Sequence, residues 1–176
     1  MRLLRRGALL LAVLGLVACG QMPAEPTVAQ AVPEDGCGEL ERPPQQAGSH
    51  LIGDAQPPVP YSSTPPTSGW HSSGALDVTI HGEDDPLLEP EQVSVLEAEG
   101  VVITYRGIDD GDVERIEELV RDRYDGRVAM SPYEPLPDGQ IALTAWGVLQ
   151  RCGALDMAAV ETFLAEHVGD VVDPGH

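Results

Sequence analysis

The sequence contains no lysine, and its 10 basic residues are all arginines set against 29 aspartates and glutamates. Over 176 residues the formal net charge is −19. Proteins that bind nucleic acid need a cationic surface that releases counterions from the phosphates. The shortage of positive charge therefore excludes nucleic acid as a partner.

Several catalytic and cofactor motifs are also missing. The sequence has no Cys-X-X-Cys pair, no glycine-rich phosphate loop, no haem motif and no Gly-X-Ser-X-Gly turn. Nucleotide, haem and thiol redox functions therefore have no support. Aromatic residues are scarce, with one Phe, two Trp and four Tyr. Trp70 and Trp146 are accordingly predicted to be core residues.

The longest apolar run is too short to cross a membrane. It covers residues 8–17, follows Arg2, Arg5 and Arg6, and ends at Ala18-Cys19, whereas a spanning helix needs about 20 apolar residues. This order predicts a signal peptide over residues 1–18. Ala18-Cys19 resembles the lipobox of bacterial lipoproteins, in which the cysteine is lipidated and becomes the first mature residue. The alternatives are an ordinary secretory signal and, from Arg5-Arg6, a twin-arginine signal.

Cleavage before Cys19 would make the protein more acidic. It removes three arginines and no acidic residue, which leaves 7 arginines, 29 acidic residues and a net charge of −22. Such a surface repels anionic headgroups, so the acyl chains must supply the membrane anchor. We expect a lipid-anchored protein on the extracytoplasmic face of the cell membrane.

The cysteine count fits an oxidising compartment. With Cys19 assigned to lipid, Cys37 and Cys152 remain as an even pair and are predicted to form a disulfide. The chain-entropy estimate for so long a loop is about 4.7 kcal/mol before strain. Two reduced thiols are the alternative.

Composition divides the mature chain into a tether over residues 19–36, a single domain over residues 37–170 and a tail over residues 171–176. Residues 42–73 are dense in Pro, Gly and Ser, which disfavours regular secondary structure. An ordered wrapping segment is the preferred interpretation and a disordered one the alternative. The apolar side chains available to anchor the wrap are Leu51, Ile52, Val59, Tyr61 and Trp70.

The rest of the domain shows regular periodicity. Apolar patterns predict four strands, at residues 92–96, 101–105, 127–131 and 140–146. Helical spacing predicts one helix from Asp109 or Asp110 up to Gly126, and another from about Asp156 to His167. The expected fold is therefore α+β, with two helices on a small sheet of about four strands preceded by the Pro/Gly-rich wrap.

Three segments carry a family resemblance. Residues 65–71 read Pro-Pro-Thr-Ser-Gly-Trp-His, residues 100–105 read Gly-Val-Val-Ile-Thr-Tyr after Leu96-Glu97, and residues 142–147 read Ala-Leu-Thr-Ala-Trp-Gly before Cys152. Together they resemble the bacterial Domain of Unknown Function 3105 family, whose members are mostly secreted or membrane-anchored. The similarity spans most of residues 46–170.

The resemblance also implies a departure. The family pattern His-X-Leu-Glu-His falls on Ser94 and Ala98, so both of its histidines are replaced, while the histidine after Ser-Gly is retained as His71. Such a histidine cluster would suit a transition metal, because imidazole binds copper and zinc well. The resemblance therefore implies a degenerate histidine site.

His71 is the residue on which the functional alternatives depend. It is interpreted either as a metal ligand, with His81 and Glu83 or Asp84 as candidate partners, or as a structural residue bonded to backbone carbonyls. A nucleophilic Ser68–His71 pair lacks an orienting acid and an oxyanion hole, and turn chemistry explains Ser68 better.

Two further carboxylates, Glu97 and Glu99, are candidates for a functional pair. Glu97 and Glu99 are expected on the same side of a strand or turn, either as paired acids or, in so acidic a chain, as a solvated pair.

The leading interpretation is a non-enzymatic, membrane-anchored lipoprotein without a cofactor, which binds an envelope protein partner or acts structurally. The alternative is a copper- or zinc-binding protein that uses His71.

Overall fold

The computed structural model describes residues 32–169. The predicted signal peptide, Cys19, the first part of the tether and the tail over residues 171–176 lie outside the described residues. Within residues 32–169, no helix is both long enough and apolar enough to cross a bilayer.

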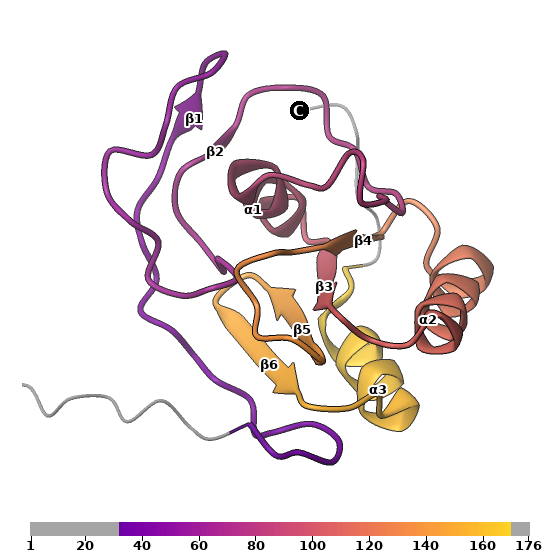
Figure 1. Ribbon diagram of the computed structural model, residues 1–176. Helices are drawn as coiled ribbons and strands as arrows, with labels where there is room; N and C mark the ends of the chain where they lie inside the picture. Colours follow the sequence, from indigo (N-terminus) through magenta and orange to yellow (C-terminus); the bar gives the residue numbers. More distant parts are fainter. Residues whose placement is uncertain (1–31, 170–176) are drawn as a thin grey trace, which may run out of the picture.

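A four-stranded mixed sheet forms the centre of the domain (Figure 1). Its strands are β3 (Val101–Arg106), β4 (Val128–Pro132), β5 (Gln140–Ala145) and β6 (Val148–Cys152), in the order β4-β3-β5-β6. β3 pairs with β4 in parallel, through a crossover that contains helix α2 (Asp110–Arg123), and the other two pairings are antiparallel. The α+β expectation is therefore confirmed.

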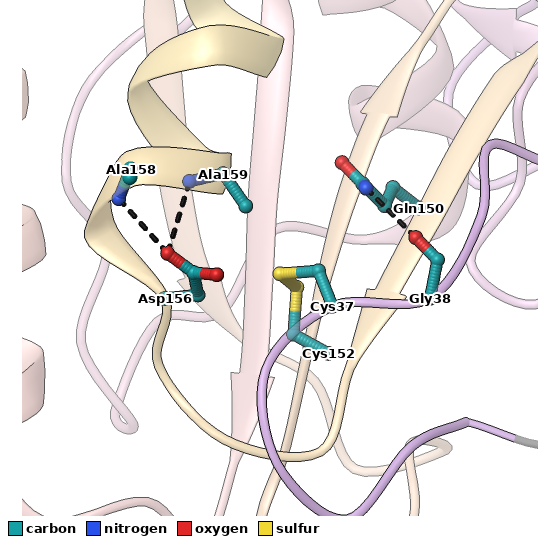
Figure 2. Close-up of a disulfide and its surroundings, with 7 residues drawn as sticks. All are labelled: Cys37, Gly38, Gln150, Cys152, Asp156, Ala158 and Ala159. Atoms are coloured by element: carbon teal, nitrogen blue, oxygen red, sulfur yellow. Dashed lines mark hydrogen bonds between the residues drawn. A yellow bond between two sulfur atoms is a disulfide. The ribbon is translucent and has the colours of Figure 1, made fainter.

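The main core lies between the sheet and two helices, α2 and α3 (Met157–His167). Side chains alternate across a strand, so Val101 and Ile103 of β3 face these helices. They pack with apolar residues of α2 and α3, among them Ile116, Phe163 and Leu164, all at most 2% exposed. Asp156 caps α3 by accepting hydrogen bonds from the amides of Ala158 and Ala159, both at 3.1 Å (Figure 2).

The opposite face of the sheet is covered by helix α1 (Glu89–Glu97). Val95 and Leu96 of α1 pack on Val102 of β3 and Ala129 of β4. The predicted strand at residues 92–96 is therefore wrong. Val93 and Val95 alternate with polar residues, which is the pattern typical of a strand. The residues just before them, however, favour the start of a helix.

Those start signals lie at residues 88–91. Pro90 stands in the first turn, where its missing N–H costs nothing. The amide of Leu88 donates to Glu91 Oε2 at 2.8 Å, and Glu89 and Glu91 place negative charge at the helix N-terminus. Gly100 then allows the chain to enter β3, because a Cβ there would lie 2.7 Å from Val95.

One strand of the central sheet was not predicted. β6 returns from β5 through a two-residue turn at Trp146-Gly147, with Ala145 paired to Val148 and Gly147 at φ 70°. A glycine in the left-handed region is the signature of a tight hairpin. The predicted strand at residues 140–146 extended through Trp146, so the turn of the hairpin was not recognised. The prediction of Trp146 as a core residue is also wrong, because its side chain is 38% exposed.

The chain segments on either side of the wrap cover both edges of the sheet. On the β6 edge, the amides of Gly38 and Glu41 donate to the carbonyls of Arg151 and Leu149, at 2.8 and 2.7 Å. On the β4 edge, the amide of His81 donates to the Met130 carbonyl at 2.8 Å. Covering unpaired edges in this way protects a sheet against pairing with other chains.

A disulfide fastens the start of the domain, just before the wrap, to the sheet. Figure 2 shows Cys37 and Cys152, the pair predicted from the sequence, with their sulfur atoms 2.01 Å apart across 115 residues of chain. Beside it, Gln150 Nε2 donates to the Gly38 carbonyl at 2.8 Å, and Arg151 forms an ion pair with Glu41.

The predicted anchors of the wrap are used unequally. Leu51 is buried, Tyr61 and Trp70 are partly buried, but Ile52 is 82% and Val59 50% exposed, so these two are not anchors. Residues 65–69 are instead fully buried, and two of them are polar, Thr67 and Ser68. The wrap is therefore held by hydrogen bonds as well as by a few apolar side chains.

Candidate metal centre

Two short strands bring two histidines together. β1 (His50–Leu51) and β2 (His71–Ser72) pair in parallel, with His50 opposite His71. The imidazole rings meet edge to face, with centroids 4.6 Å apart. His50 is exposed and His71 is 5% exposed.

Small residues make this pairing possible. A Cβ on Gly48 would lie 1.9 Å from the carbonyl oxygen of Gly69, so only glycine allows the two segments this approach. Buried Ser68 accepts a hydrogen bond from the amide of Gln46 at 2.9 Å. The Ser-Gly dipeptide before His71 is therefore structural, and Ser68 is bonded to a distant backbone amide rather than to a neighbour in its own turn.

The hydrogen-bond partner of His71 Nδ1 shows which ring nitrogen carries the proton. Nδ1 lies 3.0 Å from the carbonyl oxygen of Gly69. A carbonyl oxygen can only accept, so Nδ1 carries the proton and donates. Histidines that ligate metals are oriented in the same way, through a second hydrogen bond from the ring N–H.

The other nitrogen of His71 faces a carboxylate. Glu97 is the last residue of α1, and its Oε2 lies 2.9 Å from His71 Nε2. Nε2 is buried and makes no hydrogen bond of regular geometry with the described residues. When His71 is neutral, two electron-rich atoms face each other there, which is repulsive unless a proton or a metal cation lies between them.

His50 completes a group of three ligands. One ligand atom from each of His50, His71 and Glu97 lies within 4.8 Å of the others, and no further metal-ligand cluster occurs among residues 32–169. Two imidazoles and a glutamate form a ligand set used by zinc enzymes, in which a fourth position stays open. Glu97 has a half-exposed side chain, so the group is accessible from solvent.

The other predicted partners of His71 do not join it. His81, Glu83 and Asp84 lie outside the group, and His81 Nδ1 bonds the Asp85 carbonyl at 3.2 Å. Glu97 points to His71, whereas Glu99 occupies the turn after α1 at φ 62°.

Ser94, one of the two positions of the family's histidine pattern, contacts β2, and Ala98, the other, follows the last residue of α1. The hydroxyl of Ser94 donates to the Ser72 carbonyl at 3.0 Å, and Ala98 caps the helix. The two positions are four residues apart and share one helix face, which the mistaken strand prediction concealed.

A groove of about 530 Å³ adjoins the ligand group and shares Glu97 with it. Glu99, Trp146, Glu166 and His167 also line this groove. Burial lowers the pKa of His167, and the nearby Glu166 carboxylate opposes that shift. The groove therefore presents carboxylates, an imidazole and an exposed indole beside the three ligands.

Residues 54–175 match a family described as protein of unknown function, DUF3105. The chain belongs to the DUF3105 family. No curated protein and no solved structure matches the sequence. The DUF3105 match includes His71 and Glu97 and begins after His50.

Sequence reasoning therefore missed His50 and the role of Glu97. His50 lies 21 residues before His71, in a strand of two residues, and no local spacing connects them. The one available signal was Gly48, two residues before His50, which mirrors Gly69 two residues before His71.

Proposed function

We propose that this protein is an extracytoplasmic lipoprotein, anchored through lipid on Cys19, that binds a zinc or copper ion through His50, His71 and Glu97. The observation that carries the proposal is the approach of the buried His71 Nε2 to the Glu97 carboxylate, with His50 beside them. Binding, rather than catalysis, is the role proposed.

The ligand types select the metal class. Two imidazole nitrogens and one carboxylate oxygen suit Zn(II) and Cu(II). Calcium and magnesium prefer oxygen ligands throughout, and Cu(I) prefers sulfur. The net charge of −19 also attracts cations to the surface.

A competing arrangement needs no metal. A doubly protonated His71 would form an ion pair with Glu97 and would serve only the stability of the β2–α1 contact. That arrangement gives His50 no role beyond ring contact, so the effect of changing His50 separates the two.

The test uses the untagged mature chain, with Cys19 replaced by Ser and the disulfide intact. We expect stoichiometric zinc or copper by elemental analysis and titration calorimetry. His71→Gln should lower the affinity by more than the roughly 10- to 100-fold that losing an outer-shell partner costs. Glu97→Gln and His50→Gln should also weaken binding.

His81→Gln is the matched control, because His81 lies outside the ligand group. It should bind metal as the unmodified protein does. Absence of bound zinc and copper at micromolar supply would contradict the metal proposal, as would equal binding by the His71 and His81 variants.

The anchor is tested separately. Arg2, Arg5 and Arg6, the short apolar run and Ala18-Cys19 occur in the order that lipoprotein export requires. Cys19→Ser should abolish acyl labelling and release the protein from the membrane fraction. A variant that stays in the membrane fraction like the parent protein, with no lipid on either, would refute the anchor.

A further inference from the structure

The ligand group joins three segments of chain that are far apart in sequence. His50 lies on β1, His71 on β2 and Glu97 at the end of α1. β2 and α1 are already held together, through the Ser94–Ser72 hydrogen bond and the His71–Glu97 contact. The contribution of His50 comes from a different kind of segment.

That segment, residues 49–60, is here named the arm. Ten of its twelve residues are exposed, and Leu51 is the one that is buried. Figure 1 shows it as the loop that carries β1 and projects from the edge of the domain. Segments with few buried contacts open at low free-energy cost.

Few backbone bonds hold the arm to the domain. The amide of His71 donates to the Ser49 carbonyl at 3.3 Å, and the amide of Ser73 donates to the Leu51 carbonyl at 3.1 Å. Gln46 Nε2 holds its far end by donating to the Pro60 carbonyl at 2.8 Å. Between Ile52 and Pro60, the bonds that the described residues make are local to the arm.

We propose that a metal ion at the His50–His71–Glu97 group locks the arm onto β2, so that the arm is a metal-dependent flap. This inference rests on the proposed metal binding. A bound ion adds a bond from the arm to the β2–α1 unit, and the arm cannot open without breaking it. The ion therefore controls whether the arm, with its exposed surface around Ile52, is held against β2 or can move away from it.

Thermodynamic linkage makes the proposal quantitative. If His50 strengthens zinc binding by a given factor, bound zinc must reduce the opening equilibrium of the arm by the same factor. That factor is the ratio of the zinc affinities of the parent protein and the His50→Gln variant. We expect it to be about tenfold or more.

The test compares hydrogen exchange with and without saturating Zn²⁺ in the untagged mature chain with Cys19 replaced. The Ser73 amide is the reporter, because its partner is a carbonyl of the arm. Zinc should slow its exchange by the measured affinity ratio in the parent and in His81→Gln, but not in His50→Gln.

The outcomes separate the two proposals. Zinc binding without slower exchange at Ser73 would overturn the flap and leave metal binding in place. A parent protein that binds neither zinc nor copper would overturn both. Equal protection in His50→Gln and the parent protein would show that the arm closes without its histidine, and would also overturn the flap.

Discussion

The two parts of this domain are held together by different forces. The sheet and its helices bury an almost continuous apolar core, in which Ile103, Ile116 and Phe163 are at most 2% exposed. The chain over residues 37–73, which includes the wrap, buries little apart from Leu51, residues 65–69 and His71. It depends on edge hydrogen bonds, one disulfide and close glycine contacts.

This difference explains where the candidate site lies. A rigid core fixes Glu97 at the end of α1, while the weakly held arm supplies His50. When metal ligands come from one rigid and one weakly held element, metal binding can change how firmly the weakly held element is attached. The comparison predicts that substitutions in the two parts will differ in size and in what they disturb.

The largest effect is expected in the core. Phe163→Ala should lower the free energy of unfolding by about 3 to 5 kcal/mol, because it removes a fully buried ring and leaves a cavity. Urea unfolding of the mature chain measures the change. A loss below 1 kcal/mol would show that the main core does not carry the stability assigned to it.

Breaking the disulfide should have the next largest effect. Cys37→Ser, Cys152→Ser and the double variant should each lose about 2 to 5 kcal/mol, since opening one bridge from either end is the same event. Free-thiol titration of the denatured, non-reduced chain with Cys19 replaced should find no thiol. Two titratable thiols in oxidised material would contradict the bridge.

The glycine contact at the candidate site gives a smaller effect. Gly48→Ala would place its Cβ 1.9 Å from the Gly69 carbonyl oxygen, and overpacking of this kind costs about 1 to 3 kcal/mol. Zinc affinity should fall as well, because β1 must move away from β2. Gly82→Ala is the control, since a Cβ there meets no atom within 4 Å. Equal effects of the two changes would refute the close-approach argument.

The smallest effect is expected at the tip of the arm. Ile52→Ser should change the free energy of unfolding by less than about 0.5 kcal/mol, because this side chain is 82% exposed. Leu51→Ala, one residue away and buried, should cost about 2 kcal/mol. If thermal or urea unfolding ranks the two in the opposite order, the assignment of the inward face of β1 is wrong.

Local signals in the sequence were sufficient for much of the domain. The apolar run of β3, the spacing of α2 and the Asp156 cap of α3 each depend on neighbouring residues, so they were predictable. Residues 92–96 were mistaken for a strand because a short apolar alternation fits both periods. The first turn with Pro90 and Glu91, which resolves that ambiguity, lies just before it.

The sequence by itself determined the α+β class, the strongly acidic character, the pairing of Cys37 with Cys152 as a prediction, and His71 as the residue to examine. Only the tertiary structure decided which groups His71 meets. His50 and Glu97 lie 21 and 26 residues away along the chain. Their meeting depends on a two-residue strand pairing and on where α1 ends, and such non-local contacts leave no periodic trace in the sequence.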